Sequence, residues 1–503
     1  MEVELKNHSE YTDNLPFYTR ATDFFIGDQT TMCSPKYIVP YLTETSGEKD
    51  AGAALANRIA RSVYVNDVSA IVFNHKTSLA QSITIQGFDG GTLDLIKNDV
   101  TGYGDTPQEI YSEALEYYLQ HGRVGILVEG PGDVSDNVAE AIAKGERSYQ
   151  LLYTADRICN WELFKSGPKK GKLKDLLLFE GITSDGKETY ERYRRYFFEG
   201  GASVYAWQIL QIKSGTPVAT TGVRKFEVVG QGQGDLDEIP FTIFGRGRKD
   251  SALKDLLQPA WGAHNRLSVY SSTNYNQGFQ RVVMTGVADT KELQKVGEMI
   301  VTAIRSPDAQ VHIIPSGDPT AIETEWRALR HIVARLGLFQ WNQLMDDTRQ
   351  VQSAESKAKD LRAREAFYNN VVMTFQKKLT QVYKHHALFE GASPDEVSVH
   401  ISSDFKLTDT ELELQTDSAV MLWSNRFGDA GQQVQKAILE KYVSELRMLP
   451  TEDMTEDERR AELLDTIRTA TAQDPQQQNP LFQRTSLVER LNGQAQTNGT
   501  GVA

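Results

Sequence analysis

The sequence has few of the features that would place it in a specialised class. It holds only two cysteines, Cys33 and Cys159, which are far apart and form no Cys-x-x-Cys pair. We therefore expect inert thiols in a reducing cytoplasm, not a disulfide framework or a thiolate zinc site. No apolar run approaches the roughly 20 residues of a membrane helix, so no membrane partner is expected. The acidic, polar opening does not resemble a secretory signal peptide.

The chain is also short of positive charge. It has 54 Lys and Arg against 68 Asp and Glu, which gives a net charge of −14. Proteins that bind nucleic acid through the phosphates usually carry a basic balance or a basic block. Tight, sequence-specific DNA binding is therefore disfavoured, whereas a weak contact with DNA stays compatible with this charge.

Motifs for catalysis, cofactors and metals are missing as well. The segment GPKKGKLK at 167–174 imitates a phosphate-binding loop, but it has three residues between its glycines and Leu173 stands where Ser or Thr is needed. The glycines at 230–234 precede no capped helix. His385 and His386 are adjacent, so on a helix they point about 100° apart. We expect no cofactor and no metal, and nothing in the sequence argues for an enzyme.

What the sequence does have is length and a change of pattern. Its 503 residues, 40% hydrophobic and 24% charged, are typical of a soluble α+β protein with two or more domains. Residues 1–122 have helical spacing of apolar residues, and TPQEIYSEALEYYLQHG predicts a helix with Thr106 as N-cap, Pro107 at its first position and Gly122 as its stop. Residues 123–244 read as a meander of about six short strands.

A compact insert follows between two helices. Residues 251–280 predict the first helix, and 321–345, which include TEWRALRHIVARLGLFQWNQLM, predict the second. Between them, 281–320 is expected to be a small α/β module in which DTKELQKVGEMIVTAI forms a helix between two strands. Within these ranges, helices of about 22 to 28 residues would each reach roughly 33–42 Å and form a stalk.

The second helix is followed by a polar stretch at 346–356 and then by a long helix. Apolar residues recur on one face of that helix at steps of three, four and seven, namely Leu361, Tyr368, Val372, Phe375, Leu379 and Val382. EVSVHISSDF predicts one more strand. Residues up to 470 are mainly helical, and 471–503, rich in Gln, Asn, Thr and Gly, are expected to be disordered.

Two groups of side chains could meet a polyanion. The second stalk helix carries Arg327, Arg330 and Arg335, which would form either a solvated helix face or a weakly basic channel wall. The polar stretch carries Arg349, Gln350, Gln352 and Ser353, which would form either an ordinary surface turn or a loop that touches a moving polyanion.

This order of parts resembles the portal protein of tailed bacteriophages. EIPFTIF followed by SALKDLLQPAWGAHNRLSVYSSTNY looks like the segment that leads into that family's first stem helix, although Ala252 stands where many relatives carry Pro. FQRVVMTG resembles the strand that opens its clip. RQVQSAESKAKDLRAREAF looks like its tunnel loop running into the long wing helix. The likeness covers roughly residues 10–470.

The resemblance implies a multidomain portal fold. Its parts would be a wing at 1–250, stem helices at 251–280 and 321–345, a clip at 281–320, a tunnel loop and wing helix at 346–390, and a helical crown at 391–470. It also implies a ring, usually of twelve copies, at one capsid vertex of the virion, assembled in the host cytoplasm. The implied partners are further copies of the chain, double-stranded DNA that slides through weakly, terminase, major capsid and scaffold proteins, and tail adaptors.

The same resemblance assigns roles to residues. The polar stretch and the stem arginines would line the DNA tunnel, and the clip surface that docks motor and adaptor would include Asp289, Lys291, Glu292 and Lys295. A mostly negative wall with few cations would let DNA slide without trapping its phosphates.

Two other readings stay open from the residues. One is a nucleic-acid-processing enzyme whose β-rich core holds a site built from Asp156, Glu162, Tyr190, Glu191 and Tyr193. The other is a monomeric scaffold that binds capsid proteins. The mass of the protein in solution would separate both from a ring.

Overall fold

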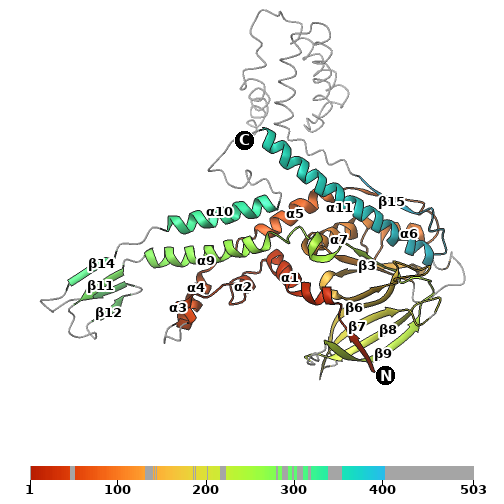
Figure 1. The fold of residues 1–503 in the computed structure, drawn as a ribbon, viewed down its shortest axis with the longest axis horizontal. Helices are drawn as coiled ribbons and strands as arrows, with labels where there is room; N and C mark the ends of the chain where they lie inside the picture. Colours follow the sequence, from red (N-terminus) through yellow and green to blue (C-terminus); the bar gives the residue numbers. More distant parts are fainter. Residues whose placement is uncertain are drawn as a thin grey trace, which may run out of the picture. The chain divides into compact units, whose positions relative to one another are not determined.

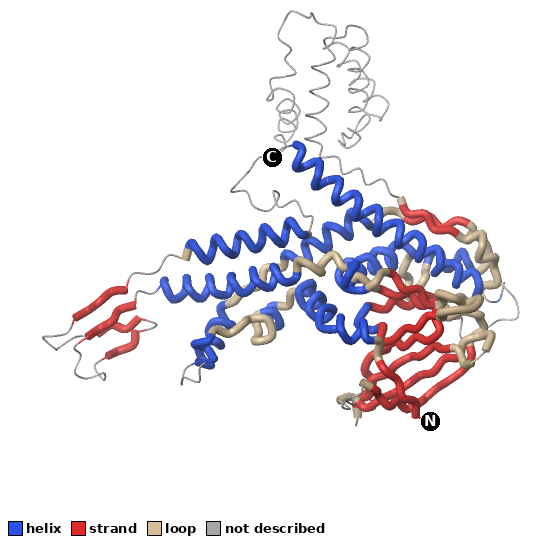
Figure 2. Tube along the Cα trace, viewed as in Figure 1, coloured by secondary structure: helices blue, strands red, loops and turns tan. Residues whose placement is uncertain are grey.

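The structure is a computed structural model that describes residues 2–402 with internal gaps. The gaps fall at 46–50, 131–139, 141, 143, 185, 187, 201, 216–221, 279–280, 286–292, 297–298, 303–309, 315–318 and 338–353. The predicted helical region and tail beyond residue 402 lie outside the described residues. Within them the chain is a mixture of helices and antiparallel sheets, so the predicted α+β class is confirmed (Figure 2).

Helices dominate the first 122 residues, as the sequence predicts. The longer ones are α1 (Ser9–Ile26), α4 (Ala51–Arg61), α5 (Asp67–Leu79) and α7 (Pro107–His121), and the shorter ones are α2 (Gln29–Met32), α3 (Leu42–Thr45) and α6 (Leu93–Asn98). Two strands in this region were not predicted, β1 (Glu2–Lys6) and β2 (Ile83–Gln86).

Helix α7 begins and ends where its sequence signals stand. The Thr106 side chain accepts a hydrogen bond from the Glu109 amide while the Glu109 carboxylate accepts one from the Thr106 amide, which is a capping box. Pro107 occupies the first turn, where its missing N–H is not needed. Gly122 closes the helix in the left-handed conformation at φ 72°. The predicted boundaries are confirmed at both ends.

The helical stretch between residues 51 and 79 is broken in its middle. Residues 62–66 leave the helix, the Asn66 side chain accepts from the Ser69 amide to start α5, and Tyr64 turns into the core, where its hydroxyl donates to the Phe24 carbonyl. Val63, which the helical spacing placed on the core face, is instead 51% exposed. The helix is interrupted here because the Asn66 side chain is better suited to cap the start of α5 than to continue a helix from α4.

The described residues of 123–244 form eight strands, where the sequence predicted about six. Five of them join β1 in a six-stranded antiparallel sheet ordered β1-β9-β8-β7-β6-β5, and the other three form a small sheet ordered β10-β3-β4. The bounds are β3 Val124–Glu129, β4 Tyr149–Thr154, β5 Ile158–Leu163, β6 Leu173–Ser184, β7 Thr189–Phe197, β8 Ala206–Lys213, β9 Val223–Gln233 and β10 Phe241–Phe244. The run SYQLLYTADRICNWEL supplies two strands because the 3-10 turn η1 (Ala155–Arg157) divides it.

The six-stranded sheet has a core on each face. In β6, Leu176 and Leu178 join the cluster that includes Tyr153 and Phe241 of the small sheet. Leu177, which points the opposite way, joins the cluster with Tyr11 of α1. The small sheet therefore lies between the large sheet and the helices, and β10 and β3 also pack on α11 (Ala354–Phe389) (Figure 2).

Helix α11 buries the apolar face that the sequence predicts. Tyr368, Val372, Phe375, Leu379 and Val382 are all at most 2% exposed. The helix already includes 354–356, which the sequence assigned to the polar stretch. The strand predicted after it is β15 (Ser398–Ile401), which pairs with β2.

Two helices and a set of strands form the predicted stalk and insert. Helix α9 (Leu257–Gly278) and helix α10 (Thr320–Leu336) lie side by side, and β11 (Arg281–Thr285) pairs with β14 (Gln310–Ile314) where the chain continues from them (Figure 1). Helix α10 ends at Gly337, nine positions before the predicted polar stretch begins at 346.

The helix predicted inside the insert is wrong. Within DTKELQKVGEMIVTAI, β12 (Leu293–Val296) and β13 (Met299–Thr302) form an antiparallel hairpin with Val296 opposite Met299. The β-branched residues Val296, Ile300, Val301 and Thr302 favour strands, and the Gly297 between the two runs disfavours a helix interior. The insert is therefore a β module in its described residues, not an α/β one.

Candidate functional site

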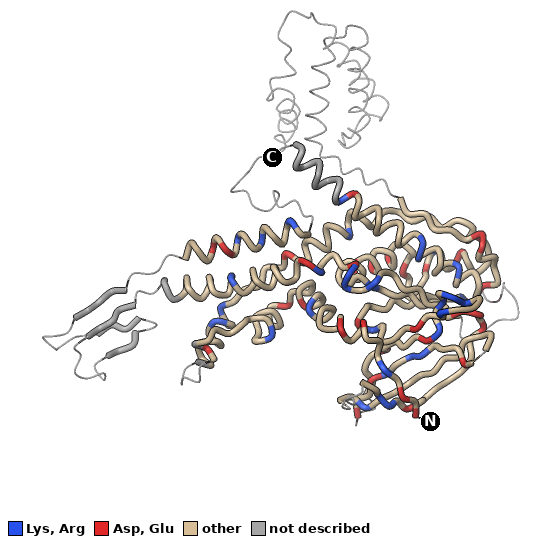
Figure 3. The backbone as a smooth tube through the Cα atoms, in the orientation of Figure 1, with Lys and Arg blue, Asp and Glu red and all other residues tan. Residues whose placement is uncertain are grey.

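Helices α9 and α10 form an antiparallel pair held by matched contacts along their length. Arg266 of α9 pairs with Glu325 of α10 at 2.8 Å, and the Tyr270 hydroxyl lies 3.4 Å from a Glu323 carboxylate oxygen. Gly262 of α9 faces Leu329 of α10, since a Cβ placed at Gly262 would lie 3.6 Å from Leu329 Cδ1, an ordinary packing distance. Acidic and basic positions are interleaved along α10, with Glu323 in its first turn and Arg335 in its last (Figure 3). That order complements the helix dipole.

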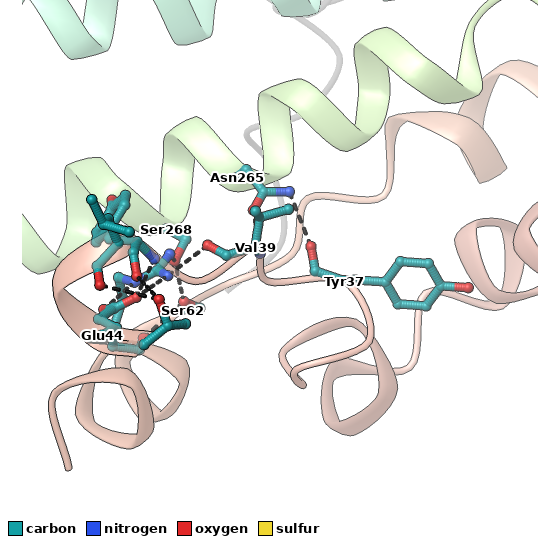
Figure 4. A network of polar contacts seen from close by, with 10 residues as sticks. Tyr37, Val39, Glu44, Ser62, Asn265 and Ser268 are labelled. Atoms are coloured by element: carbon teal, nitrogen blue, oxygen red, sulfur yellow. Dashed lines mark hydrogen bonds and ion pairs between the residues drawn. The ribbon is translucent and has the colours of Figure 1, made fainter. Parts of the chain in front are cut away.

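A buried polar network fixes the opposite side of α9 to the N-terminal part of the chain. The Arg58 guanidinium binds both oxygens of Glu44, the Ser268 hydroxyl and the Val39 carbonyl (Figure 4). Arg58 is 2% exposed and Glu44 8%. The hydrogen bonds from Arg58 hold the pKa of the Glu44 carboxyl below its usual value, so the pair stays ionic.

Three further hydrogen bonds extend this attachment. The Ser62 and Ser268 hydroxyls lie 2.7 Å apart, Asn265 donates to the Tyr37 carbonyl, and the Trp261 indole also donates to that carbonyl. At about 100° per residue, these α9 positions lie nearly opposite Gly262, Arg266 and Tyr270, which face α10. Helix α9 is therefore held between α10 and the segment that contains 37–45 and α4.

Helix α10 has its own attachments to α5. The Arg330 guanidinium makes two hydrogen bonds of 2.7 Å to Asp67, the first residue of α5, and lies over the Trp326 ring at 5.1 Å. Both side chains are mostly buried, at 13% and 16% exposure. Asp67, Trp326 and Arg330 also line a small hollow together with His264 and Leu267 of α9. The base of the stalk is thus built from α5, α9 and α10, and the Arg330–Asp67 ion pair within it is mostly shielded from solvent.

The structure places the predicted polyanion contacts in different environments. Arg330 is engaged in the pair with Asp67, and Arg327 is exposed and bound to Glu323 one turn earlier. Arg335 is exposed near the end of α10. Arg349, Gln350, Gln352 and Ser353 lie outside the described residues.

The predicted docking residues of the insert are largely outside the described part. Asp289, Lys291 and Glu292 fall in the gap at 286–292. Lys295 lies in β12 and is paired in register with Ile300 of β13.

The five residues of the alternative enzyme site have structural partners. The Tyr193 hydroxyl donates to Glu191, whose carboxylate also binds Arg224 at 2.9 Å. Tyr190 donates to Glu188, Glu162 faces Lys174 at 3.3 Å, and the Asp156 carbonyl accepts from Tyr11. Tyr193 and Glu191, which share a hydrogen bond, both lie in β7, and the Glu162–Lys174 pair joins the neighbouring strands β5 and β6.

One cluster of a serine, a histidine and a carboxylate does occur. The Ser148 hydroxyl lies 2.8 Å from His386 Nδ1 and donates to Glu390 at 2.7 Å. Both Ser148 and His386 have no exposed surface, and burial lowers the pKa of His386 to about 3. No substrate could reach this hydroxyl, so the cluster serves to fasten the C-terminal end of α11 to β4.

The neighbouring His385 takes part in a second fastening. Its Nε2 lies 3.0 Å from Glu238, which also binds Lys172 at 2.6 Å. These two partners lower the pKa of Glu238 to about 2. The adjacent histidines therefore point to different partners, as their angular separation on a helix predicts.

Sequence reasoning missed the residues that hold the stalk in place, chiefly Arg58, Glu44, Asp67 and His75. No short motif marks them, because their partners lie far along the chain. Among the described residues, no three His, Cys, Asp or Glu side chains gather as a metal site. No helix of the described part is long and apolar enough to cross a membrane.

Comparisons with known proteins add a distant likeness. No family model and no curated protein matches the chain. A chain in the neck of an empty gene transfer agent particle, computed with C6 symmetry, is 14% identical, with 86% of this chain and 99% of that chain covered and a TM-score of 0.31. A chain in the virion of a native gene transfer agent particle is also 14% identical, with 83% and 94% covered and a TM-score of 0.30. Because both TM-scores are this low, these likenesses assign no role to the present chain.

Proposed function

We propose that this chain is the subunit of a portal ring, the conduit at one capsid vertex through which double-stranded DNA is packaged and ejected. The observation that supports it most is the pair α9 and α10, which leads from an α+β body to a β module and returns. That order of parts is the one for which the sequence resembles bacteriophage portal proteins. In this proposal α9 and α10 are the stem, and β11–β14 belong to the clip.

A ring needs a heterologous contact that closes on itself. The stem offers apolar surface for such a contact, because Ile332 and Leu336 of α10 and Val39, Tyr41 and Leu42 beside α9 are exposed in the single chain. Burial of these side chains against a neighbouring copy would stabilise the ring by the hydrophobic effect.

The proposal accounts for the net charge of −14, because a mostly negative tunnel wall would let DNA slide without trapping its phosphates. Paired arginines such as Arg327 and Arg330 present less free positive charge to a sliding phosphate backbone than unpaired ones. The proposed partners are DNA, terminase, capsid and scaffold proteins, and tail adaptors.

Light scattering after size exclusion, with electron microscopy of the same peak, tests the proposal. A ring of twelve would have twelve times the 56.4 kDa mass of the chain and a central hole. A chain that stays monomeric at high concentration and in the presence of capsid and scaffold proteins would contradict it.

A further inference from the structure

A buried histidine sits where three helices meet at the base of the stalk. His75 of α5 is 2% exposed. Its Nε2 lies 2.7 Å from the carbonyl oxygen of Gly337, which ends α10, and its Nδ1 lies 3.0 Å from the hydroxyl of Tyr368 in α11. One imidazole therefore bridges α10 and α11 from a position on α5.

The partners fix the protonation state of the ring. A carbonyl oxygen can only accept, so Nε2 carries the proton and donates to Gly337. Nδ1 then holds the lone pair and accepts from the Tyr368 hydroxyl. Burial lowers the pKa of His75 to about 4, so this neutral form persists at physiological pH. Both ring nitrogens are used, and each holds a different helix.

Packing at the same point leaves little room for adjustment. A Cβ at position 337 would come within 2.7 Å of Ile71 Cδ1 and 2.9 Å of its Cγ2, so a larger residue there would force the Ile71 side chain to shift. Gly337 has φ −76°, an ordinary value for any residue, so the close approach of Ile71 and not the backbone conformation disfavours a larger residue. The rings of Phe367 and Tyr368 lie 5.5 Å and 5.7 Å from the His75 ring and close the remaining sides.

We propose that His75 is a positioning residue that locks the end of α10 to α11, so that the two helices move as one unit. The Arg330–Asp67 pair, two turns earlier, fixes α10 to α5. His75 hydrogen-bonds to both α10 and α11 and thereby links these two helices. When α10 is displaced, α11 is therefore displaced with it, because the two helices do not move relative to each other at the end of α10. This inference holds whether or not the chain forms a portal ring.

The test measures the distance between the two helices. Spin labels are placed at R335C on α10 and M373C on α11, both exposed positions, in a C33S background where the remaining Cys159 is buried. A second pair, F73C on α5 with M373C, reports on the body alone. Labelled chain is diluted with unlabelled chain so that distances within one copy are read.

H75F removes both hydrogen bonds and keeps an aromatic ring. We expect the R335C–M373C distance distribution to widen by about two-fold, as for a packed joint that gains a second arrangement, while the F73C–M373C distribution stays unchanged. H331F is the control, because it makes the same substitution at an exposed histidine of α10. It should leave both distributions as in the parent.

Two further variants keep the test decisive if H75F does not fold. Y368F removes only the Nδ1 contact and should widen the distribution less, and G337A should shift its mean because the new methyl group meets Ile71. If H75F and Y368F lower thermal stability yet leave the α10–α11 distribution as narrow as in the parent, His75 merely stabilises the fold and the proposed coupling is wrong.

Discussion

Asp67 and Arg330 stand 263 positions apart in the sequence, yet the carboxylate of the first accepts two hydrogen bonds of 2.7 Å each from the guanidinium of the second. The bidentate geometry is the strong form of an ion pair, and the surrounding burial reduces screening by salt. The pair joins the first turn of α5 to the middle of α10. The pair thereby fixes the position of α10 relative to α5, to which α10 makes few other contacts.

Removal of Arg330 should therefore destabilise the protein. We expect R330A to lower the free energy of unfolding by about 2–3 kcal/mol, somewhat less than for a fully buried pair, because Asp67 would be left without its partner. Urea unfolding followed by circular dichroism measures this. R327A, which removes an exposed pair one turn away, should cost about 0.5 kcal/mol or less. Equal losses for the two variants would contradict a special role for the Arg330 pair.

The buried pair of Arg58 and Glu44 should matter more. R58A leaves the Glu44 carboxylate and the Ser268 hydroxyl without their donor in a dry environment, and we expect a loss of about 3–5 kcal/mol. Hydrogen exchange should rise in the middle of α9 in the same variant, because Ser268 belongs to that helix. The comparison variant is K36A, whose ion pair with Asp23 is half exposed at Lys36. Unchanged exchange in α9 would show that the network does not hold the helix.

Acid should weaken the body through its buried histidines. Burial lowers the pKa of His75 and of His121 to about 4 and that of His386 to about 3, against 6.5 in an unfolded chain. The unfolded chain therefore binds more protons between these values. The stabilisation is complete above pH 6.5 and is lost as the pH falls toward 4, by up to about 1.4 kcal/mol per pH unit for each histidine.

Urea midpoints at pH 7, 6 and 5 check this dependence. H386Q should flatten the profile, because glutamine does not titrate, whereas H331Q at an exposed position should keep the parent slope. A midpoint that does not change between pH 7 and pH 5 would contradict the assignment of neutral, buried histidines.

The proposed docking role of the insert makes a separate prediction. Reversal of charge in a K291E/K295E double variant should abolish or strongly reduce DNA packaging while the ring still forms, because the change is confined to the insert. A packaging assay with purified terminase, together with the mass of the ring, separates the two effects. Normal packaging by the double variant would show that these lysines are not part of a motor contact.

How much the sequence could predict depends on the range of the interactions. Helix α7 was predicted at both ends because Thr106, Glu109 and Gly122 act within one turn of each end. The buried face of α11 was predicted because its spacing repeats along a single helix. Strand β1 was missed although Val3 and Leu5 alternate with charged residues, since the stretch is short and its partner β9 lies over 200 positions away.

The errors have local causes as well. The hairpin β12–β13 was predicted to be a helix because the spacing of its apolar residues fits the period of a helix as well as that of a strand. Its β-branched residues and Gly297 favour strands over a helix. The second stem helix was predicted over 321–345; α10 covers Thr320–Leu336 of it, and 338–345 lie outside the described residues. The joints at Arg58, Asp67 and His75 could not be predicted, because each depends on partners that only the folded chain brings together.

Strand β1 has a consequence for the order of events during synthesis. It precedes its partner β9 by more than 200 positions, so the large sheet gains this edge strand only after β9, which ends at Gln233, has been made. Until then β1 offers unpaired backbone groups to other chains.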